Sequence, residues 1–202
     1  MRKYISLVAL FFLFKLNYAS DKIVPASEVI KPGTTLYYRV TANNTSYPFI
    51  VKIISMDKNK GITFEYDQQS ATPKKARVEL TAEALKDAQS MHNLFNGKDA
   101  VLNNSISLFL STKMYNEIYN NQPKDGGQIR SAAIKLDAKD AAPMLFNNNE
   151  YKKIYAAKDG LFSTNEIQNE ETNYIIRFAE DVKCPLITYM DLGWSIALEK
   201  IE

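Results

Sequence analysis

The feature that most constrains the fold is a two-residue alternation of apolar and polar side chains that recurs along the chain. Between residues 36 and 40, the apolar Leu36, Tyr38 and Val40 alternate with two more polar residues. Successive side chains of a β-strand point to opposite faces, so this pattern predicts a strand with one buried face. Similar patterns, or runs of β-branched residues, predict strands at residues 49–56, 62–66, 129–136, 151–155, 162–167, 174–178 and 194–198, with a shorter one around Val78 and Leu80.

Short turns join several of these predicted strands. Asp57-Lys58-Asn59-Lys60-Gly61 has the composition of a turn and predicts a hairpin between the strands on either side of it. Consecutive strands joined in this way favour an antiparallel sheet, which must bury one of its faces. We therefore expect an α+β fold that is mainly β, with a bent or barrel-like antiparallel sheet and a two-helix insert.

The period changes to that of a helix in the middle of the chain. Over residues 81–95, apolar residues recur at i, i+4, i+7 and i+11, and they are Ala84, Ala88, Met91 and Phe95. Thr81 is a suitable N-cap for this helix, and Asn96-Gly97 is suited to end it. Ser111 can cap a second, shorter helix that carries Met114, Tyr115, Ile118 and Tyr119. Residues 120–127 have the composition of a loop.

The first twenty residues have the pattern of a secretory signal peptide. Arg2 and Lys3 precede an apolar run that ends at Phe14, and Ala19 and Ser20 offer cleavage points. The apolar run is too short for a permanent membrane span, which needs about 20 residues. We therefore expect export to the periplasm or the extracellular space, and a single β-rich domain over residues 21–202. The alternative is a buried N-terminal strand or helix.

Net charge argues against a nucleic-acid partner. The whole chain carries 25 basic and 23 acidic residues, a net charge of +2. Arg2, Lys3 and Lys15 all lie in the expected leader, which leaves 22 basic and 23 acidic residues in the mature chain. A nucleic-acid binder needs a basic excess that this chain lacks. We expect no nucleic-acid partner, and instead a small molecule, a glycan or an envelope protein.

Residues that carry common chemistries are scarce. His92 is the only histidine and Cys184 the only cysteine, which excludes the usual zinc sites and leaves few partners for a nucleophile. Burial as a small apolar residue is the expected role of Cys184. We expect no metal, no cofactor and no catalytic residue. A hydrolase with two carboxylates remains an alternative, and its candidate acids are Glu65, Asp137, Asp140, Glu180 and Asp181.

Aromatic residues are the one unusual feature of the composition. The chain has twelve tyrosines, ten phenylalanines and a single tryptophan, Trp194. Rings on a sheet face can stack on sugars or line an apolar pocket. The candidate ligand-binding residues are Tyr37, Arg39, Tyr66, Tyr151 and Tyr155.

These features favour an exported, non-catalytic protein that binds a small apolar or carbohydrate ligand. The alternatives are a structural or interaction protein of the cell envelope and the carboxylate hydrolase. For the apolar segment from Pro185 to Trp194 we expect packing in the core before the last strand. The alternatives are that it folds over a barrel mouth or docks a partner.

Overall fold

A computed structural model describes residues 23–57, 59–92, 95–120, 133–136, 144–145, 147–157, 160–169 and 173–202. Its helices are short, and they are α1 (Ala26–Val29), α2 (Ala82–Asp87) and α3 (Thr112–Asn120). The strands before residue 110 are β1 (Thr35–Ala42), β2 (Thr45–Asp57), β3 (Gly61–Gln68), β4 (Lys74–Leu80), β5 (Ser90–Met91), β6 (Ala100–Leu102) and β7 (Ser105–Ile106). The later strands are β8 (Ala133–Leu136), β9 (Met144–Leu145), β10 (Asn147–Ala157), β11 (Gly160–Asn169), β12 (Tyr174–Ala179), β13 (Ile187–Asp191) and β14 (Ser195–Ile201).

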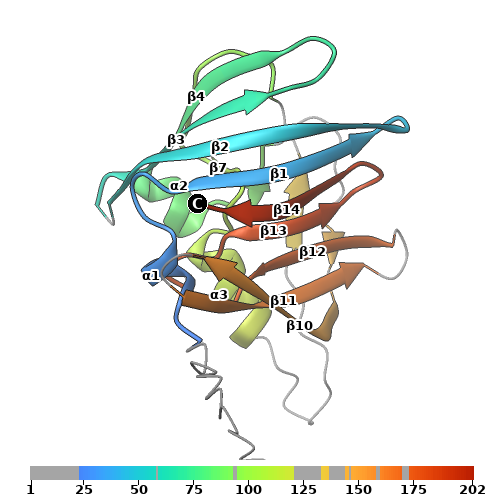
Figure 1. Cartoon of the computed structure of the whole chain (residues 1–202). Helices are drawn as coiled ribbons and strands as arrows, with labels where there is room; N and C mark the ends of the chain where they lie inside the picture. Colours follow the sequence, from blue (N-terminus) through green and yellow to red (C-terminus); the bar gives the residue numbers. More distant parts are fainter. Residues whose placement is uncertain are drawn as a thin grey trace, which may run out of the picture.

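One large sheet dominates the described part of the chain. It has ten strands in the order β10-β11-β12-β13-β14-β1-β2-β3-β4-β6. All neighbours are antiparallel except β4 and β6, which run parallel. The sheet is bent and open, and it does not close into a barrel (Figure 1). The predicted mainly β, antiparallel bent sheet is confirmed, and so is the hairpin around residues 57–61, whose strands pair from Asp57 and Gly61 onwards.

The first and the last long strands among the described residues meet at the centre of the large sheet. Leu36 on β1 pairs with Ile201 on β14, and Val40 pairs with Ile196. The backbones of Thr35 and Glu202 add two hydrogen bonds, of 2.6 and 2.9 Å, at one end of this pairing. We call the β14–β1 pairing the central seam. It joins a half-sheet of C-terminal strands, β10 to β14, to a half-sheet of N-terminal strands, β1 to β4 with β6.

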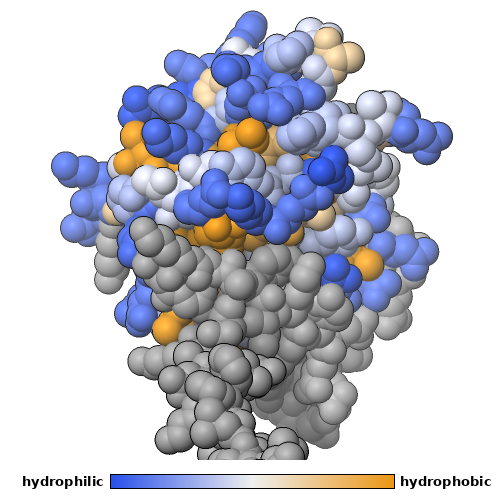
Figure 2. All heavy atoms as spheres, in the orientation of Figure 1, coloured by the Kyte–Doolittle hydropathy of each residue, from blue (hydrophilic) through white to orange (hydrophobic). Residues whose placement is uncertain are grey.

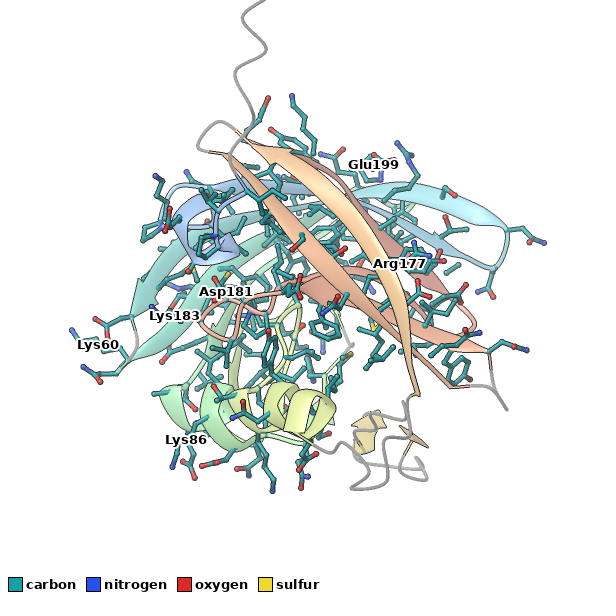
Figure 3. The ribbon with its side chains drawn as sticks, turned by 90° about the horizontal axis from the view of Figure 1, so that it is seen from below. Lys60, Lys86, Arg177, Asp181, Lys183 and Glu199 are labelled. Atoms are coloured by element: carbon teal, nitrogen blue, oxygen red, sulfur yellow. The ribbon has the colours of Figure 1, made fainter. Side chains whose placement is uncertain are left out.

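The insert between β4 and β10 covers the inner face of the large sheet. It contains α2, α3 and a small second sheet in the order β7-β5-β8-β9. Figures 1 and 3 show the large sheet on one side and the helices α2 and α3 on the other, and Figure 3 shows side chains between the two layers. On β1 the residues facing this layer are buried and their neighbours are not, as the alternation predicts. Phe64 from β3 and Phe178 from β12 are completely buried there.

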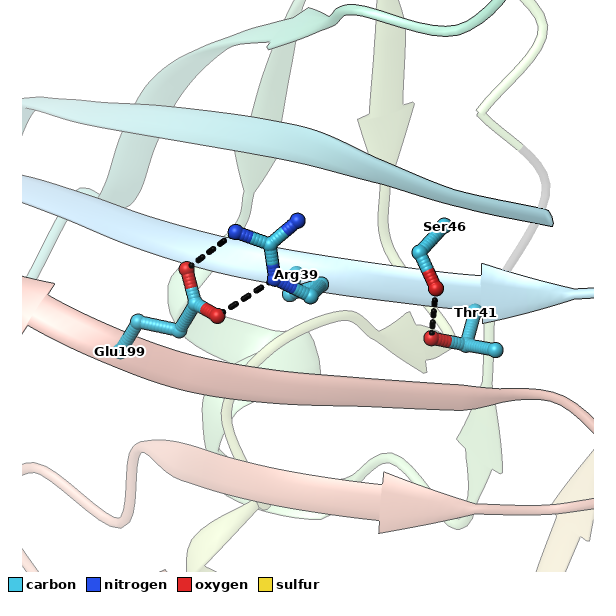
Figure 4. Close-up of polar contacts among 4 residues, drawn as sticks. All are labelled: Arg39, Thr41, Ser46 and Glu199. Carbon is cyan, nitrogen blue, oxygen red and sulfur yellow. Dashed lines mark hydrogen bonds and ion pairs between the residues drawn. The ribbon is translucent and has the colours of Figure 1, made fainter.

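The outer face of the sheet is polar around the central seam. Arg39 on β1 forms two hydrogen bonds to the Glu199 carboxylate on β14, of 2.5 and 3.1 Å (Figure 4). The Thr41 and Ser46 hydroxyls lie 2.8 Å apart at the end of the β1–β2 hairpin. On the side seen in Figure 2, hydrophilic residues cover most of the described surface and apolar ones show only in scattered areas. The buried face is therefore the one toward the insert.

The helix predicted for residues 81–95 is wrong beyond Asp87. Thr81 is its N-cap, as predicted, since the Thr81 hydroxyl accepts a hydrogen bond from the Ala84 N–H. Ala88 has extended backbone angles, and the following residues form β5, which pairs in parallel with β7 and β8. The Ser111 hydroxyl donates to the Ala88 carbonyl at 2.6 Å. Ala84, Ala88 and Met91 are buried all the same, so their spacing predicted burial correctly and the helix length wrongly.

The second helix was predicted correctly, with its cap. The Ser111 hydroxyl accepts a hydrogen bond of 3.0 Å from the Met114 N–H, and Met114, Tyr115 and Ile118 are buried. The loop at residues 121–127 and the first part of the strand predicted at 129–136 lie outside the described residues. Of the segment from Pro185 to Trp194, residues 187–191 form β13, a strand of the large sheet that the sequence analysis did not predict.

Candidate functional site: an aromatic hollow

The inner face of the sheet is hollowed at the end where the β1–β2 hairpin closes. The hollow has a volume of about 220 Å³ and is open on one side. We call it the aromatic hollow. It is lined by Val40, Ala42, Tyr47, Phe49, Gln68, Lys74, Phe95, Trp194 and Ile196.

Strand register explains why these residues meet. Val40 on β1 pairs with Tyr47 on β2 and with Ile196 on β14, so all three side chains lie on one face of the sheet. Gln68 on β3 pairs with Lys74 on β4 in the same way. Because β1, β2, β3, β4 and β14 are neighbours in the sheet, their inner-face residues at this end form one continuous surface. Phe95 and Trp194 reach it from the segments that follow β5 and β13.

Three packed rings support the hollow. The ring centroids of Phe49 and Phe95 are 4.7 Å apart, those of Tyr66 and Phe95 are 5.0 Å apart, and those of Phe49 and Tyr66 are 5.3 Å apart. These separations are those of favourable aromatic pairs. Phe49 and Tyr66 are buried, and the Tyr66 hydroxyl accepts a hydrogen bond of 2.9 Å from the Gly97 N–H. That bond ties the segment carrying Phe95 to β3 and fixes one wall of the hollow.

Hydrogen-bond donors surround this aromatic surface. Tyr47, Lys74 and Trp194 are half-buried, and within the described ranges no residue pairs with the Tyr47 hydroxyl, the Lys74 ammonium or the Trp194 indole N–H. Partial burial raises the pKa of Tyr47, which keeps its hydroxyl protonated over a wide pH range. The hollow thus combines ring faces with donors that can bind the oxygen atoms of a ligand.

The size and composition of the hollow limit what it can do. Pockets for drug-sized ligands have volumes of roughly 300–1,000 Å³, so this smaller hollow suits a single ring. None of its nine lining residues is an acid, a histidine, a serine or a cysteine. The carboxylate pair that the hydrolase alternative requires is therefore absent from the lining, which presents ring faces and hydrogen-bond donors suited to binding a ligand.

The five residues suggested by the sequence do not form one site. Tyr66 lies under the aromatic hollow, but it is 3 % exposed and supports the hollow without being accessible. Tyr37 and Arg39 lie on the opposite, outer face of the sheet, where the Tyr37 hydroxyl donates to Glu202 at 2.7 Å. That hydrogen bond raises the pKa of Tyr37. Tyr151 and Tyr155 are on β10, whose side chains are outside the described part of the structure.

The accessible residues of the hollow were missed because they come together only in the folded sheet. The sequence analysis assigned Tyr47 to no element, Phe95 to a helix and Trp194 to the last strand and to the apolar segment before it, and it named none of the three as a ligand-binding residue. One signal was available for Tyr47. It lies two residues before the buried Phe49, so a strand extended backwards from residue 49 places both rings on the same face.

A second and wider hollow lies over β2, β3 and β4, and its charges are balanced. Its volume is about 560 Å³, and its lining includes three cations and three anions, namely Lys52, Lys75, Arg77, Glu65, Asp67 and Asp99. Lys75 pairs with Asp67 at 2.9 Å, and Glu65 on β3 is the cross-strand neighbour of both Lys52 on β2 and Arg77 on β4. Because its opposite charges lie side by side, this surface offers little attraction to a ligand of either sign.

Other candidates from the sequence have structural roles. Asp181 accepts hydrogen bonds of 2.9 Å from the Ser27 and Lys183 N–H groups, so its carboxylate holds α1 and a turn in place. Burial raises the pKa of the Cys184 thiol, which is fully enclosed. His92 follows β5 instead of lying on a helix, and its N–H donates to the Ile106 carbonyl at 2.7 Å. Asp137 and Asp140 fall outside the described ranges.

The described residues show neither a metal site nor a membrane-spanning helix. No group of three or more His, Cys, Asp or Glu side chains among them is arranged to hold a metal ion. No helix in the same part of the chain is both long and apolar enough to cross a membrane.

Comparisons with protein-family models, with curated proteins and with solved structures find no match to this chain.

Proposed function

We propose that this protein is a non-catalytic binding protein that holds one ring of a carbohydrate in the aromatic hollow. The observation that carries the proposal is the combination of accessible ring faces with three donors that have no partner in the described structure, on Tyr47, Lys74 and Trp194. The C–H face of a sugar ring stacks on an aromatic ring, and its hydroxyl oxygens accept hydrogen bonds. A purely apolar ligand would leave those donors unused, and this favours the sugar.

The affinity expected for a single ring is low. A pyranose has about 12 non-hydrogen atoms, and about 0.3 kcal/mol for each gives about 4 kcal/mol, or a Kd of about 1 mM. A longer glycan binds more tightly only where further rings contact the protein. The first assay therefore has to detect millimolar binding directly.

Trp194 provides the assay, because it is the only tryptophan in the chain and it lines the hollow. We expect methyl β-D-glucopyranoside to change the wavelength or the intensity of its fluorescence in a saturable manner. Cyclohexylmethanol, which has a ring of similar size and a single hydroxyl, serves as the apolar comparison. The sugar proposal is wrong if the alcohol saturates the signal and a series of neutral pyranoses does not.

Two tyrosine variants on neighbouring strands separate the hollow from the rest of the sheet. Tyr47→Ala removes an accessible ring of the hollow and is expected to weaken pyranose binding at least about fivefold, which corresponds to about 1 kcal/mol. Tyr37→Ala removes a ring from the outer face and should leave binding unchanged. Equal losses in both variants would contradict a site at the hollow.

We also propose that the chain is exported and that residues 1–20 are removed. The support is the basic, apolar and small-residue pattern of that segment. Mass spectrometry of the protein made from its full sequence in a Gram-negative bacterium tests this. We expect a mature N-terminus at Ser20 or Asp21 in the periplasm or the medium, and an intact chain confined to the cytosol would refute it.

A further inference from the structure

The Lys74 side chain has no acidic partner among the described residues. Its neighbour Lys75 pairs with Asp67 on the outer face of the sheet at 2.9 Å, whereas no acidic group in the described ranges lies within ion-pair distance of Lys74. Lys74 is half-buried, and the inner-face register with Gln68 places it at the aromatic hollow. A lysine can bury its stem and keep its ammonium in water, so the charge of Lys74 is available to a ligand in the hollow.

The surroundings of Lys74 hold its stem in place. Gly97 packs beside it, and a Cβ on Gly97 would lie 3.4 Å from the Lys74 Cβ and 3.5 Å from its Cγ. Gly97 is itself fixed by the hydrogen bond from its N–H to the Tyr66 hydroxyl. The lysine stem is therefore packed against an anchored segment of backbone, and the residue belongs to the lining of the hollow.

The charge of the lining is also one-sided. Of its nine residues, Lys74 is the only one with a charged side chain, and the other polar groups include the donors of Tyr47 and Trp194. Desolvation by ring faces strengthens the attraction of a cation for an anion, because the local dielectric constant is lower than in water. The hollow therefore complements a ring with a negative charge better than a neutral ring.

We propose that the ligand is an anionic sugar, such as a uronic acid or a sulfated sugar, and that the Lys74 ammonium pairs with its charged substituent. This inference rests on the proposed carbohydrate-binding function and names the class of sugar. A lysine ammonium is a compact charge with three rotatable donors, so it can pair with either a planar carboxylate or a tetrahedral sulfate.

Trp194 fluorescence titrations with matched sugars test the proposal. Methyl β-D-glucuronide and glucose 6-sulfate provide the two anionic groups, and methyl β-D-glucopyranoside is the neutral probe. We expect both anionic probes to bind about three- to tenfold more tightly than the neutral one at low ionic strength. We also expect added salt to reduce that preference and to leave binding of the neutral sugar almost unchanged.

Variants at two adjacent lysines show whether the preference comes from the hollow. Lys74→Gln should bring the anionic and neutral probes to within about twofold of each other, and Lys74→Arg should retain the preference. Lys75→Gln removes the same charge on the opposite face and should also retain it. A preference reduced equally by Lys74→Gln and Lys75→Gln would overturn the inference, because it would reflect only the net charge of the protein.

The remaining outcomes separate this inference from the proposed function. Equal binding of anionic and neutral sugars by the unmodified protein overturns the inference and leaves carbohydrate binding in place. If no probe changes the fluorescence of Trp194, both fail. Thermal unfolding of each variant confirms that a lost preference does not come from a lost fold.

Discussion

Gly61 is expected to be one of the least replaceable residues of the sheet. It closes the β2–β3 turn with a φ of +106°, and holding an alanine in such a conformation costs roughly 1–3 kcal/mol. An alanine Cβ would also lie 1.9 Å from the Leu80 carbonyl oxygen, which no side-chain rotation can relieve. Leu80 is held by its pairing with Ile62, so β4 or the turn itself must move. Overpacking of this kind costs roughly 1–3 kcal/mol more.

Gly33→Ala is the matched control for Gly61→Ala. Gly33 has a φ of +95°, but a Cβ there would meet no atom within 4 Å, so only the conformational cost remains. For a domain of this size each kcal/mol shifts Tm by roughly 2–4 °C. Adding about 2 kcal/mol for the steric overlap, we expect Gly61→Ala to melt about 4–8 °C below Gly33→Ala, as measured by circular dichroism. Melting temperatures within about 2 °C of each other would refute this account of Gly61.

Three further predictions concern stability and reactivity. Burial raises the pKa of the Cys184 thiol, so on raising the pH this thiol ionises first in the unfolded state. The contribution of the protonated thiol to the free energy of unfolding is complete below about pH 8.5, the ordinary pKa of a cysteine. Above that pH it falls by about 1.4 kcal/mol per pH unit. Urea unfolding between pH 8 and 9.5 should show this loss of stability in the natural protein and less of it in Cys184→Ala. A thiol reagent should label Cys184 in the folded protein no faster than local or global unfolding exposes it. Tyr66→Phe removes the acceptor for the Gly97 N–H and should cost about 1 kcal/mol in thermal unfolding and weaken sugar binding, and unchanged binding would contradict the positioning role of this bond. Ser111→Ala should cost more than Thr81→Ala, for which about 1 kcal/mol is expected. Both hydroxyls cap a helix and donate to a carbonyl, but the Ser111 hydroxyl is completely buried and its bond to Ala88 is 2.6 Å, whereas the bond from the half-buried Thr81 to Leu102 is 3.3 Å. An equal loss of Tm in the two variants would refute this order.

Features set by neighbouring residues could be predicted from the sequence. The Asp57 carboxylate accepts from the N–H groups of Asn59 and Lys60, and Gly61 supplies the positive φ, so the whole turn is specified within five residues. The cap of α3 is equally local, because Ser111 and Met114 are three residues apart. Alternation in β1 was sufficient to assign its buried face.

Features set by tertiary pairing could not be predicted in this way. Ala84, Ala88 and Met91 fit a helix and also fit the observed turn into β5, because both bury the same side chains. Strand β13 could not be predicted because its pairing with β12 shifts register between Arg177 and Phe178. This shift interrupts the alternation of buried and exposed side chains along β13. The hollow depends on strands that are distant in the chain, so its lining could not be read from any one segment.

The central seam also determines when this protein can finish folding. Its contacts join residue 36 to residue 201, so they form only after residue 201 has been synthesised. Until then β1 and β13 each keep one unpaired edge, which is where edge-to-edge aggregation begins. Contacts between such distant residues make folding slow, because a long loop must close before the pairing stabilises it. Among the described strands, a chain that stops before β14 is therefore left with two separate half-sheets and four open edges. Loss of the 7 residues of β14 is expected to be far more damaging than their number suggests.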